Sequence, residues 1–269
     1  MGEAIAESDV LLETMENGIA VMRLNRPSKL NALADATVDT IVALLDEVAA
    51  SSARVLIITG NGRGFCAGFD LSLAATIELA EGEPEAAGWM RRQERYAGMV
   101  AKLRSIPQPV IAAVNGASCG AGFALALGCD LRIAAKSAKF NCAFIKIGMS
   151  SCDMGLSYLL PRCIGTTNAF ELMLTGRMVF ADDAQRLGIV SKVVDDEALM
   201  ESAVALAQEI VANNMMGVWM TKRGMWANLD SSFDSAIELE NRTQILIHGT
   251  GDLHRLASAG GFMEGAKKR

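Results

Sequence analysis

The segment Pro109-Val-Ile-Ala-Ala-Val-Asn-Gly-Ala-Ser-Cys-Gly-Ala-Gly122 carries the pattern on which the fold prediction rests. Its first part, residues 110–114, is a short apolar run of the kind found in buried strands. Its second part, residues 116–122, consists of small residues that include three glycines. A helical pattern follows at residues 123–127. A strand, a glycine-rich turn and a helix in succession are typical of an α/β protein.

An earlier part of the chain has the same organisation. The apolar run at residues 55–59 leads into Gly62-Arg-Gly-Phe-Cys-Ala-Gly-Phe-Asp-Leu71. Amphipathic helices are expected on either side of it, at residues 34–49 and 85–105. Nearer the N-terminus, Asn17-Gly18 lies between two β-like runs and predicts a hairpin.

The rest of the chain completes the fold prediction. Further strands are expected at residues 131–134 and 189–194, and mostly helices after residue 202. These elements predict an α/β fold with a mixed or parallel sheet. We expect a core at residues 1–200 and a helical C-terminal region at residues 201–269.

Composition excludes several classes of function. The chain has 269 residues and a net charge of −6, which disfavours binding to nucleic acid and to anionic membranes. No apolar run approaches the ~18 residues that span a bilayer, and the N-terminus lacks the features of a signal peptide. We therefore expect a cytoplasmic protein. The six cysteines form no CxxC pair, so no metal site is predicted, and reduced, buried thiols are expected.

The two glycine-rich turns indicate a binding site. In open α/β sheets, ligands bind at the carboxyl ends of the strands, where glycines allow the backbone to come close. Two adjacent turns of this kind can direct two N–H groups at one oxygen and so form an oxyanion hole. One such turn alone is more often only a turn. A dinucleotide site is disfavoured, because Leu125 stands where that fingerprint requires glycine or alanine.

Several motifs in a fixed order give the chain a resemblance to a known family. They are Leu24-Asn-Arg-Pro27, Leu30-Asn-Ala-Leu33, Gly64-Phe-Cys-Ala-Gly-Phe-Asp-Leu71, Pro109–Gly116 with Gly120-Ala-Gly122, Ser157-Tyr-Leu-Leu-Pro-Arg162 with Gly165, and Leu174-Thr-Gly-Arg177. From about residue 10 onward the chain resembles the crotonase (enoyl-CoA hydratase/isomerase) superfamily. The resemblance implies a spiral of ββα units with a helical C-terminal region, assembled as a homotrimer or a dimer of trimers.

The resemblance also implies the ligand and its contacts. An acyl-CoA thioester would bind with its carbonyl oxygen between the backbone N–H groups of Phe69 and Ala121. Coenzyme A would enter as part of the substrate, with no separate cofactor. The residues that the resemblance assigns to the CoA moiety and to the backbone of the two turns are Arg26, Ser28, Lys29, Leu30, Ala67, Gly68, Gly120 and Lys267. Exposed cations such as Arg26 and Lys29 are also common on plain solvated surfaces.

The chain departs from the family at the two catalytic glutamates that hydratases use. Ala124 and Phe144 stand at those positions, and neither side chain can move a proton. Asp153 lies just before the following helix, where other superfamily members carry a functional aspartate. We treat Asp153 as the candidate acid/base residue, with a helix N-cap as the alternative role. Asp70 is expected to have a structural role in the turn after Phe69.

Three functions remain open at this point. An enoyl-CoA hydratase is favoured, with Asp153 replacing the two glutamates. An enoyl-CoA isomerase suits a single proton-carrying residue. A non-catalytic acyl-CoA-binding protein is compatible with the loss of both glutamates.

Overall fold

Six strands form the larger of two sheets, in the order β1-β2-β3-β5-β7-β10. In the computed structural model, which describes residues 8–249, the strands are β1 (Val10–Thr14), β2 (Ile19–Leu24), β3 (Val55–Gly60), β5 (Val110–Val114), β7 (Leu131–Ala135) and β10 (Lys192–Val194). The first two strands form the predicted hairpin and pair antiparallel, while all the other neighbours are parallel. Every residue of β3 and β5 is buried, as the two apolar runs predicted.

A smaller sheet has the order β4-β6-β8-β9. Its strands are β4 (Gly64–Cys66), β6 (Ala117–Cys119), β8 (Lys139–Asn141) and β9 (Val179–Phe180). The first three are parallel, and β9 pairs antiparallel with β8. These strands were not predicted, because two or three residues are too few to show an alternating pattern.

The two sheets are built by one repeated unit. A strand of the large sheet is followed by a strand of the small sheet and then by a helix, as in β3-β4-α2, β5-β6-α3 and β7-β8-α4. The helices are α2 (Glu85–Ser105), α3 (Ala121–Gly128) and α4 (Leu156–Ile164). This arrangement confirms the predicted α/β fold and its ββα spiral. It also places both glycine-rich turns beside the small sheet.

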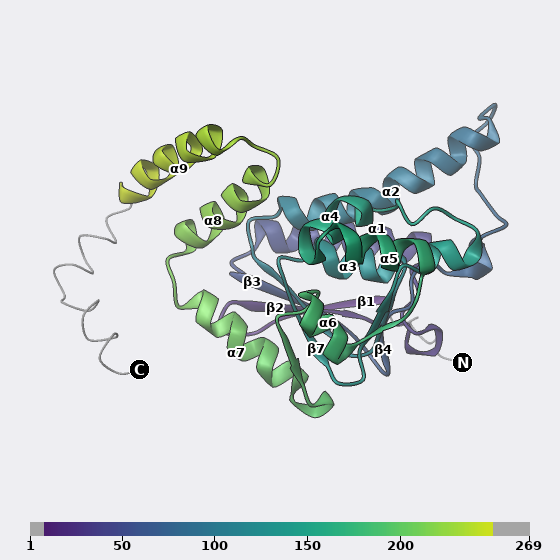
Figure 1. The fold of residues 1–269 in the computed structure, drawn as a ribbon, viewed down its shortest axis with the longest axis horizontal. Helices are drawn as coiled ribbons and strands as arrows, with labels where there is room; N and C mark the ends of the chain where they lie inside the picture. The colour runs from purple at the N-terminus through teal and green to yellow at the C-terminus, as the bar shows by residue number, and fades with distance from the viewer. Residues whose placement is uncertain (1–7, 250–269) are drawn as a thin grey trace, which may run out of the picture. The chain divides into compact units, whose positions relative to one another are not determined.

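Helices cover the sheets by packing on one another in chain order. Helix α1 (Asp35–Ala50) contacts α2, α2 contacts α3, α3 contacts α4, and α4 contacts α5 (Thr166–Thr175), on one side of the large sheet (Figure 1). The predicted apolar face of α1 is buried through Val38, Ile41 and Leu45. Helix α6 (Ala181–Leu187) packs against β10 and β9.

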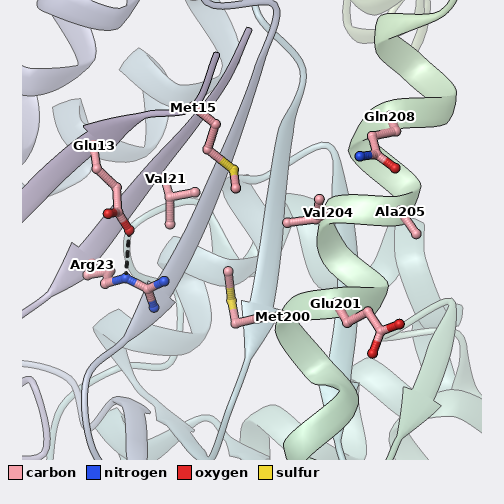
Figure 2. A pocket seen from close by; sticks show the side chains of 9 residues that line it. All are labelled: Glu13, Met15, Val21, Arg23, Met200, Glu201, Val204, Ala205 and Gln208. Atoms are coloured by element: carbon pink, nitrogen blue, oxygen red, sulfur yellow. Dashed lines mark hydrogen bonds and ion pairs between the residues drawn. The ribbon is translucent and has the colours of Figure 1, made fainter. Parts of the chain in front are cut away.

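Helix α7 (Leu199–Val211) borders a cavity beside the N-terminal hairpin. Figure 2 shows Met200 and Val204 of α7 facing Met15 and Val21 beside the hairpin. A cavity of about 500 Å³ lies between these groups.

The chain divides into two compact units, residues 1–209 and residues 210–269. In the second unit, α8 (Met215–Asn228) and α9 (Phe233–His248) pack on each other. The side chains of Asn214 and Ser232 cap their N-termini, as their residue types favour. Helices were predicted throughout this region. Among the described residues, no helix is long and apolar enough to cross a membrane.

Asn31 explains why one of the recognised motifs has its sequence. Its side chain is buried and accepts from the Arg26 amide, and it donates to the carbonyls of Asn61 and Gly64. The residue lies at φ 57°, a left-handed conformation that asparagine tolerates better than most residues. It therefore ties the segment after β2 to the turn that leads into β4.

Replacing Asn31 by alanine should destabilise the fold strongly. The change removes the acceptor of the Arg26 amide and the donor to the Asn61 and Gly64 carbonyls, and it places alanine in a left-handed conformation. We therefore expect a loss of about 3 kcal/mol. Urea unfolding followed by circular dichroism measures this loss. Asn213→Ala, at an exposed residue, serves as the control and should change the stability by less than about 0.5 kcal/mol. Equal effects from the two substitutions would contradict this account of Asn31.

Candidate active site

A cavity of about 140 Å³ lies between α2, the two glycine-rich turns and the segment before α4. Its lining residues are Phe69, Trp89, Arg92, Gln93, Tyr96, Ala121, Phe144, Ile147, Met149, Asp153 and Met154. The lining includes all three residues that sequence analysis named as catalytic candidates, Phe69, Ala121 and Asp153. They come from three successive ββα units and meet only in the folded chain.

The backbones of the two turns come very close to each other. A methyl group on Gly122 would lie 2.0 Å from the carbonyl oxygen of Cys66, a distance that no side chain can adopt. A methyl group on Gly68 would lie 2.7 Å from the Cys119 oxygen and 3.5 Å from the Ala121 nitrogen. Gly68 also has φ 103°, which favours glycine. Glycine at these two positions is what allows the turns to meet.

This contact leaves two N–H groups beside the cavity. Leu33 and Phe69 form an isolated parallel β-bridge, in which the Leu33 amide donates to the Gly68 oxygen and the Asp70 amide donates to the Leu33 oxygen. Neither of these two bonds uses the N–H of Phe69. Ala121 is the first residue of α3, where the N–H has no partner inside the helix. Among the described residues, neither amide has a recorded protein acceptor. Two such donors can stabilise charge on a single oxygen.

Asp153 supplies a carboxylate to the same cavity. The Asp153 side chain is half-buried, and its Oδ1 accepts a hydrogen bond from Gln93 Nε2. Helix α4 begins at Leu156 and its N-cap residue is Gly155, with no side-chain cap. The alternative role of Asp153 as the N-cap is therefore wrong. Met154 next to it has φ 45°, a strained conformation of a kind that clusters at functional sites.

The two usual glutamate positions contribute no ionisable group. Ala124 is fully buried within α3. Phe144 lines the cavity, and its ring lies 3.8 Å from the place where a methyl group on Gly120 would be. Among the described lining residues, Asp153 is the one carboxylate.

Helix α2 forms one wall of the cavity, which sequence analysis did not predict. Trp89, Arg92, Gln93 and Tyr96 recur at intervals of three and four residues, the spacing of one helix face. That spacing was visible in the sequence. It did not show that the face borders a ligand site, because a mixed face of this kind also suits contact with other helices.

Arg92 holds the wall to the first turn. It forms an ion pair with Asp35 at 2.6 Å and donates to the carbonyls of Leu73 and Thr76. Its guanidinium lies 5.9 Å from the ring centroid of Phe69 and 5.2 Å from that of Trp89. The positive charge of Arg92 is thus matched by protein groups.

The segment predicted to lie along CoA runs beside the first turn. Ser28 and Lys29 belong to a short 3-10 helix (Pro27–Lys29) and are exposed. The Ala67 amide donates to the Leu30 carbonyl, which joins the two predicted CoA-binding segments. Lys267 lies outside the described residues. The assignment of these residues to CoA stays a prediction.

Arg26 has extensive contacts within the protein. Its Nη2 donates to Asp70 at 2.9 Å, its Nη1 donates to the Ala32 carbonyl, and its Nε lies 3.4 Å from Asp9. The predicted role of Arg26 as a phosphate partner also stays a prediction. In this structure its guanidinium holds the residue that follows Phe69.

Asp70 has the structural role expected of it. It is the N-cap of a 3-10 helix (Leu71–Leu73), and its Oδ1 accepts from the amide and the hydroxyl of Ser72. These bonds, together with the Arg26 guanidinium, hold the pKa of the Asp70 carboxyl below its usual range. Asp70 therefore stays ionised and fixes the turn beside Phe69.

The cysteines near the turns are not suited to nucleophilic chemistry. Burial raises the pKa of Cys66 and of Cys142 to about 12, so both thiols stay protonated at neutral pH. All six cysteines are free. The prediction of burial is wrong for Cys152, which is exposed. Within residues 8–249, no group of three or more potential ligands is placed to hold a metal ion.

The larger cavity beside α7 has a different character. Its lining contains the Glu13–Arg23 ion pair, with N···O 3.1 Å, and aliphatic side chains of the hairpin and α7 (Figure 2). It contains none of the residues named as catalytic candidates. The cavity at the glycine-rich turns is the candidate active site.

Comparison with known proteins agrees with this geometry. The family model described as enoyl-CoA hydratase/isomerase matches residues 14–268. The chain belongs to this family. A probable enoyl-CoA hydratase of Mycobacterium bovis is 40% identical over 240 residues, which cover 88% of this chain and 84% of that protein. The 1,2-epoxyphenylacetyl-CoA isomerase of Escherichia coli is 36% identical, over 93% of this chain and 95% of that protein.

Solved structures of enoyl-CoA hydratase/isomerase relatives share the fold over nearly the whole chain. A probable enoyl-CoA hydratase/isomerase from Mycobacterium abscessus superposes with a TM-score of 0.89, at 37% identity and 96% coverage of both chains. A putative enoyl-CoA hydratase from Streptomyces coelicolor gives a TM-score of 0.87 at 33% identity, covering 98% of this chain and 94% of that chain. The resemblance found in the sequence is thereby confirmed.

The lowered pKa of Asp70 predicts a pH-dependent stability. We expect Asp70→Asn to reduce the free energy of unfolding at pH 7 by about 1–3 kcal/mol, since bonds to a charged group are lost. The contribution is present above the unfolded pKa of about 3.9 and is lost as pH falls through the lower folded value. Denaturant unfolding from pH 7 down to pH 2 measures it, with Asp183→Asn as a surface control. A difference between Asp70→Asn and wild type that stays constant over this range would contradict the prediction.

Proposed function

We propose that the protein is an acyl-CoA enzyme of the enoyl-CoA hydratase type, with Asp153 as its acid/base residue. The observation that carries this proposal is the meeting of Phe69, Ala121 and Asp153 in one cavity. Family membership and the names of the relatives support the hydratase reaction.

The two backbone amides would stabilise the thioester oxygen. When a nucleophile adds to an enoyl thioester, negative charge moves to this oxygen as an enolate forms. The N–H groups of Phe69 and Ala121 are positioned before the reaction, so they need little reorganisation to accept that charge. Coenzyme A enters as part of the substrate, and Arg26, Lys29 and the Ser28–Leu30 segment are its proposed contacts.

Asp153 would carry the proton in hydration. Its carboxylate takes a proton from water while the water oxygen bonds to C3 of the enoyl group, and the C2=C3 electron pair moves toward the thioester oxygen. The same proton then passes from Asp153 to C2. The sum is the addition of one water molecule, and one carboxylate is enough to balance it.

An enoyl-CoA isomerase is the second candidate. A double-bond shift needs one group that removes a proton from one carbon and returns it to another. A single carboxylate in a cavity that Phe144 also lines suits this reaction, and the E. coli relative is named as an isomerase. In both candidate reactions the enolate oxygen and Asp153 have the same roles.

The cavity favours a small acyl group. Its volume of about 140 Å³ is close to that of an engineered protein cavity of about 150 Å³ that holds benzene. Four aromatic residues, Phe69, Trp89, Tyr96 and Phe144, line it. A four-carbon chain or a single ring would fit this space.

Assembly and location are also proposals. Large apolar side chains remain exposed on the α8–α9 pair, including Leu229, Phe233, Ile245 and Leu246. Exposed apolar groups of this size support association of chains. We propose a homotrimer or a dimer of trimers in the cytoplasm. Light scattering measures the molar mass and so distinguishes three chains from six.

Hydratase activity should be seen with a short substrate and should require Asp153. We expect wild type to remove the enoyl-thioester absorbance of crotonyl-CoA faster than that of a long-chain 2-enoyl-CoA, and Asp153→Ala to lose at least about 100-fold in kcat. Asp183→Ala, at an exposed ion pair of α6, is the control. A gain of the same absorbance with a 3-enoyl-CoA would instead establish the isomerase. Tight acyl-CoA binding without either reaction would establish a binding protein.

A proline at position 121 tests the oxyanion donor directly. Proline is well tolerated at the first residue of a helix, so Ala121→Pro removes the N–H with little change to α3. We expect kcat to fall by about 10²–10³, the usual cost of one oxyanion donor. Circular dichroism confirms that the variant is folded. Full activity in the folded variant would exclude Ala121 as a donor.

A further inference from the structure

Gln93 is placed to control Asp153 from a different part of the chain. It lies in α2, 60 residues before Asp153, and donates from Nε2 to the Asp153 Oδ1 atom. Both side chains line the candidate active-site cavity. Within residues 8–249, no other side chain donates a hydrogen bond to the Asp153 carboxylate. The bond therefore distinguishes the two carboxylate oxygens from each other.

The arginines that flank Gln93 on α2 bind other carboxylates. Arg91 pairs with Glu83, Arg92 with Asp35 and Arg95 with Asp39. Arg92 also lines the cavity, but its guanidinium is held by Asp35 and by two backbone carbonyls. The partner of Asp153 is thus a neutral amide, although it comes from α2, a helix that carries several arginines.

A neutral donor suits a residue that must take and return a proton. A guanidinium paired with a carboxylate strongly favours the charged form, so a protonated intermediate would be disfavoured. An amide N–H orients the carboxylate with a weaker bias, since hydrogen bonds between a neutral donor and a carboxylate lack the second charge. It can also stay bonded to Oδ1 while Oδ2 exchanges a proton with the substrate.

We propose that Gln93 is a positioning residue that fixes Oδ1 of Asp153 and so presents Oδ2 to the reacting carbon atoms of the acyl group. This inference rests on the proposed function, in which Asp153 is the acid/base residue. It applies equally to hydration and to a double-bond shift, because both use the same proton transfer. Gln93 takes no proton itself.

The geometry predicts which replacements of Gln93 are tolerated. Gln93→Met keeps the length of the side chain and removes the N–H groups, so kcat should fall by about 10- to 100-fold with little change in KM. Gln93→His keeps an N–H donor on a side chain of sufficient reach and should recover most of the activity. Glu94→Met, one residue further along α2 and outside the cavity lining, is the matched control and should behave as wild type.

A double-mutant cycle separates this inference from the proposed function. Kinetics of Gln93→Met, Asp153→Asn and the double variant are measured on whichever reaction wild type catalyses, with thermal unfolding of each variant as the folding check. If Gln93 acts through Asp153, Gln93→Met adds no further loss in the Asp153→Asn background. An additive loss, or a wild-type kcat for folded Gln93→Met, overturns the role of Gln93. A wild-type kcat for Asp153→Asn instead overturns the proposed acid/base residue.

Discussion

The contact between two backbones, Gly122 against the Cys66 carbonyl, is the constraint on which the candidate site depends. Any side chain at position 122 would overlap that oxygen, because even a methyl carbon would lie 2.0 Å away. The contact brings the turn after β4 against the first turn of α3. It is this approach, together with the left-handed conformation of Gly68, that places the amides of Phe69 and Ala121 beside one cavity.

Two arginines support the first of these turns, one from the segment before it in the chain and one from helix α2 after it. Arg26 binds Asp70 immediately after Phe69, and Arg92 binds the Leu73 carbonyl and lies near the Phe69 ring. Both cations are matched by acidic groups of the protein, Asp70 and Asp35. The positive charge around the site is therefore used to hold the backbone in place. Asp153, by contrast, is the one carboxylate among the described lining residues of the cavity, and its side-chain partner is the neutral Gln93.

Loss of the two usual glutamates changes how the scaffold would work. The proposed donors at Phe69 and Ala121 are backbone amides, so the fold can keep them whatever the side chains at these positions are. Proton transfer depends on side chains and can move to another unit of the spiral. Asp153 belongs to the β7-β8-α4 unit, and its neighbour Met154 has the strained conformation that functional residues often have. The proposed oxyanion donors and the proposed acid/base residue thus lie on separate elements.

The sequence alone determined the long elements of this protein and the position of its two glycine-rich turns. The strands predicted at 55–59 and 110–114 follow from continuous apolar runs, and the helices α1 and α2 follow from helical patterns. The two glycine-rich turns were recognisable as a pair. Asp153 was identified as a candidate from its position before α4. The tertiary structure decided what local patterns do not record. The small sheet was missed because its strands have two or three residues, too few for a period to appear. The α2 wall and the Gln93–Asp153 bond depend on residues 60 positions apart. Such pairs meet only when the repeated units are stacked, and stacking depends on packing between units, which no local pattern contains.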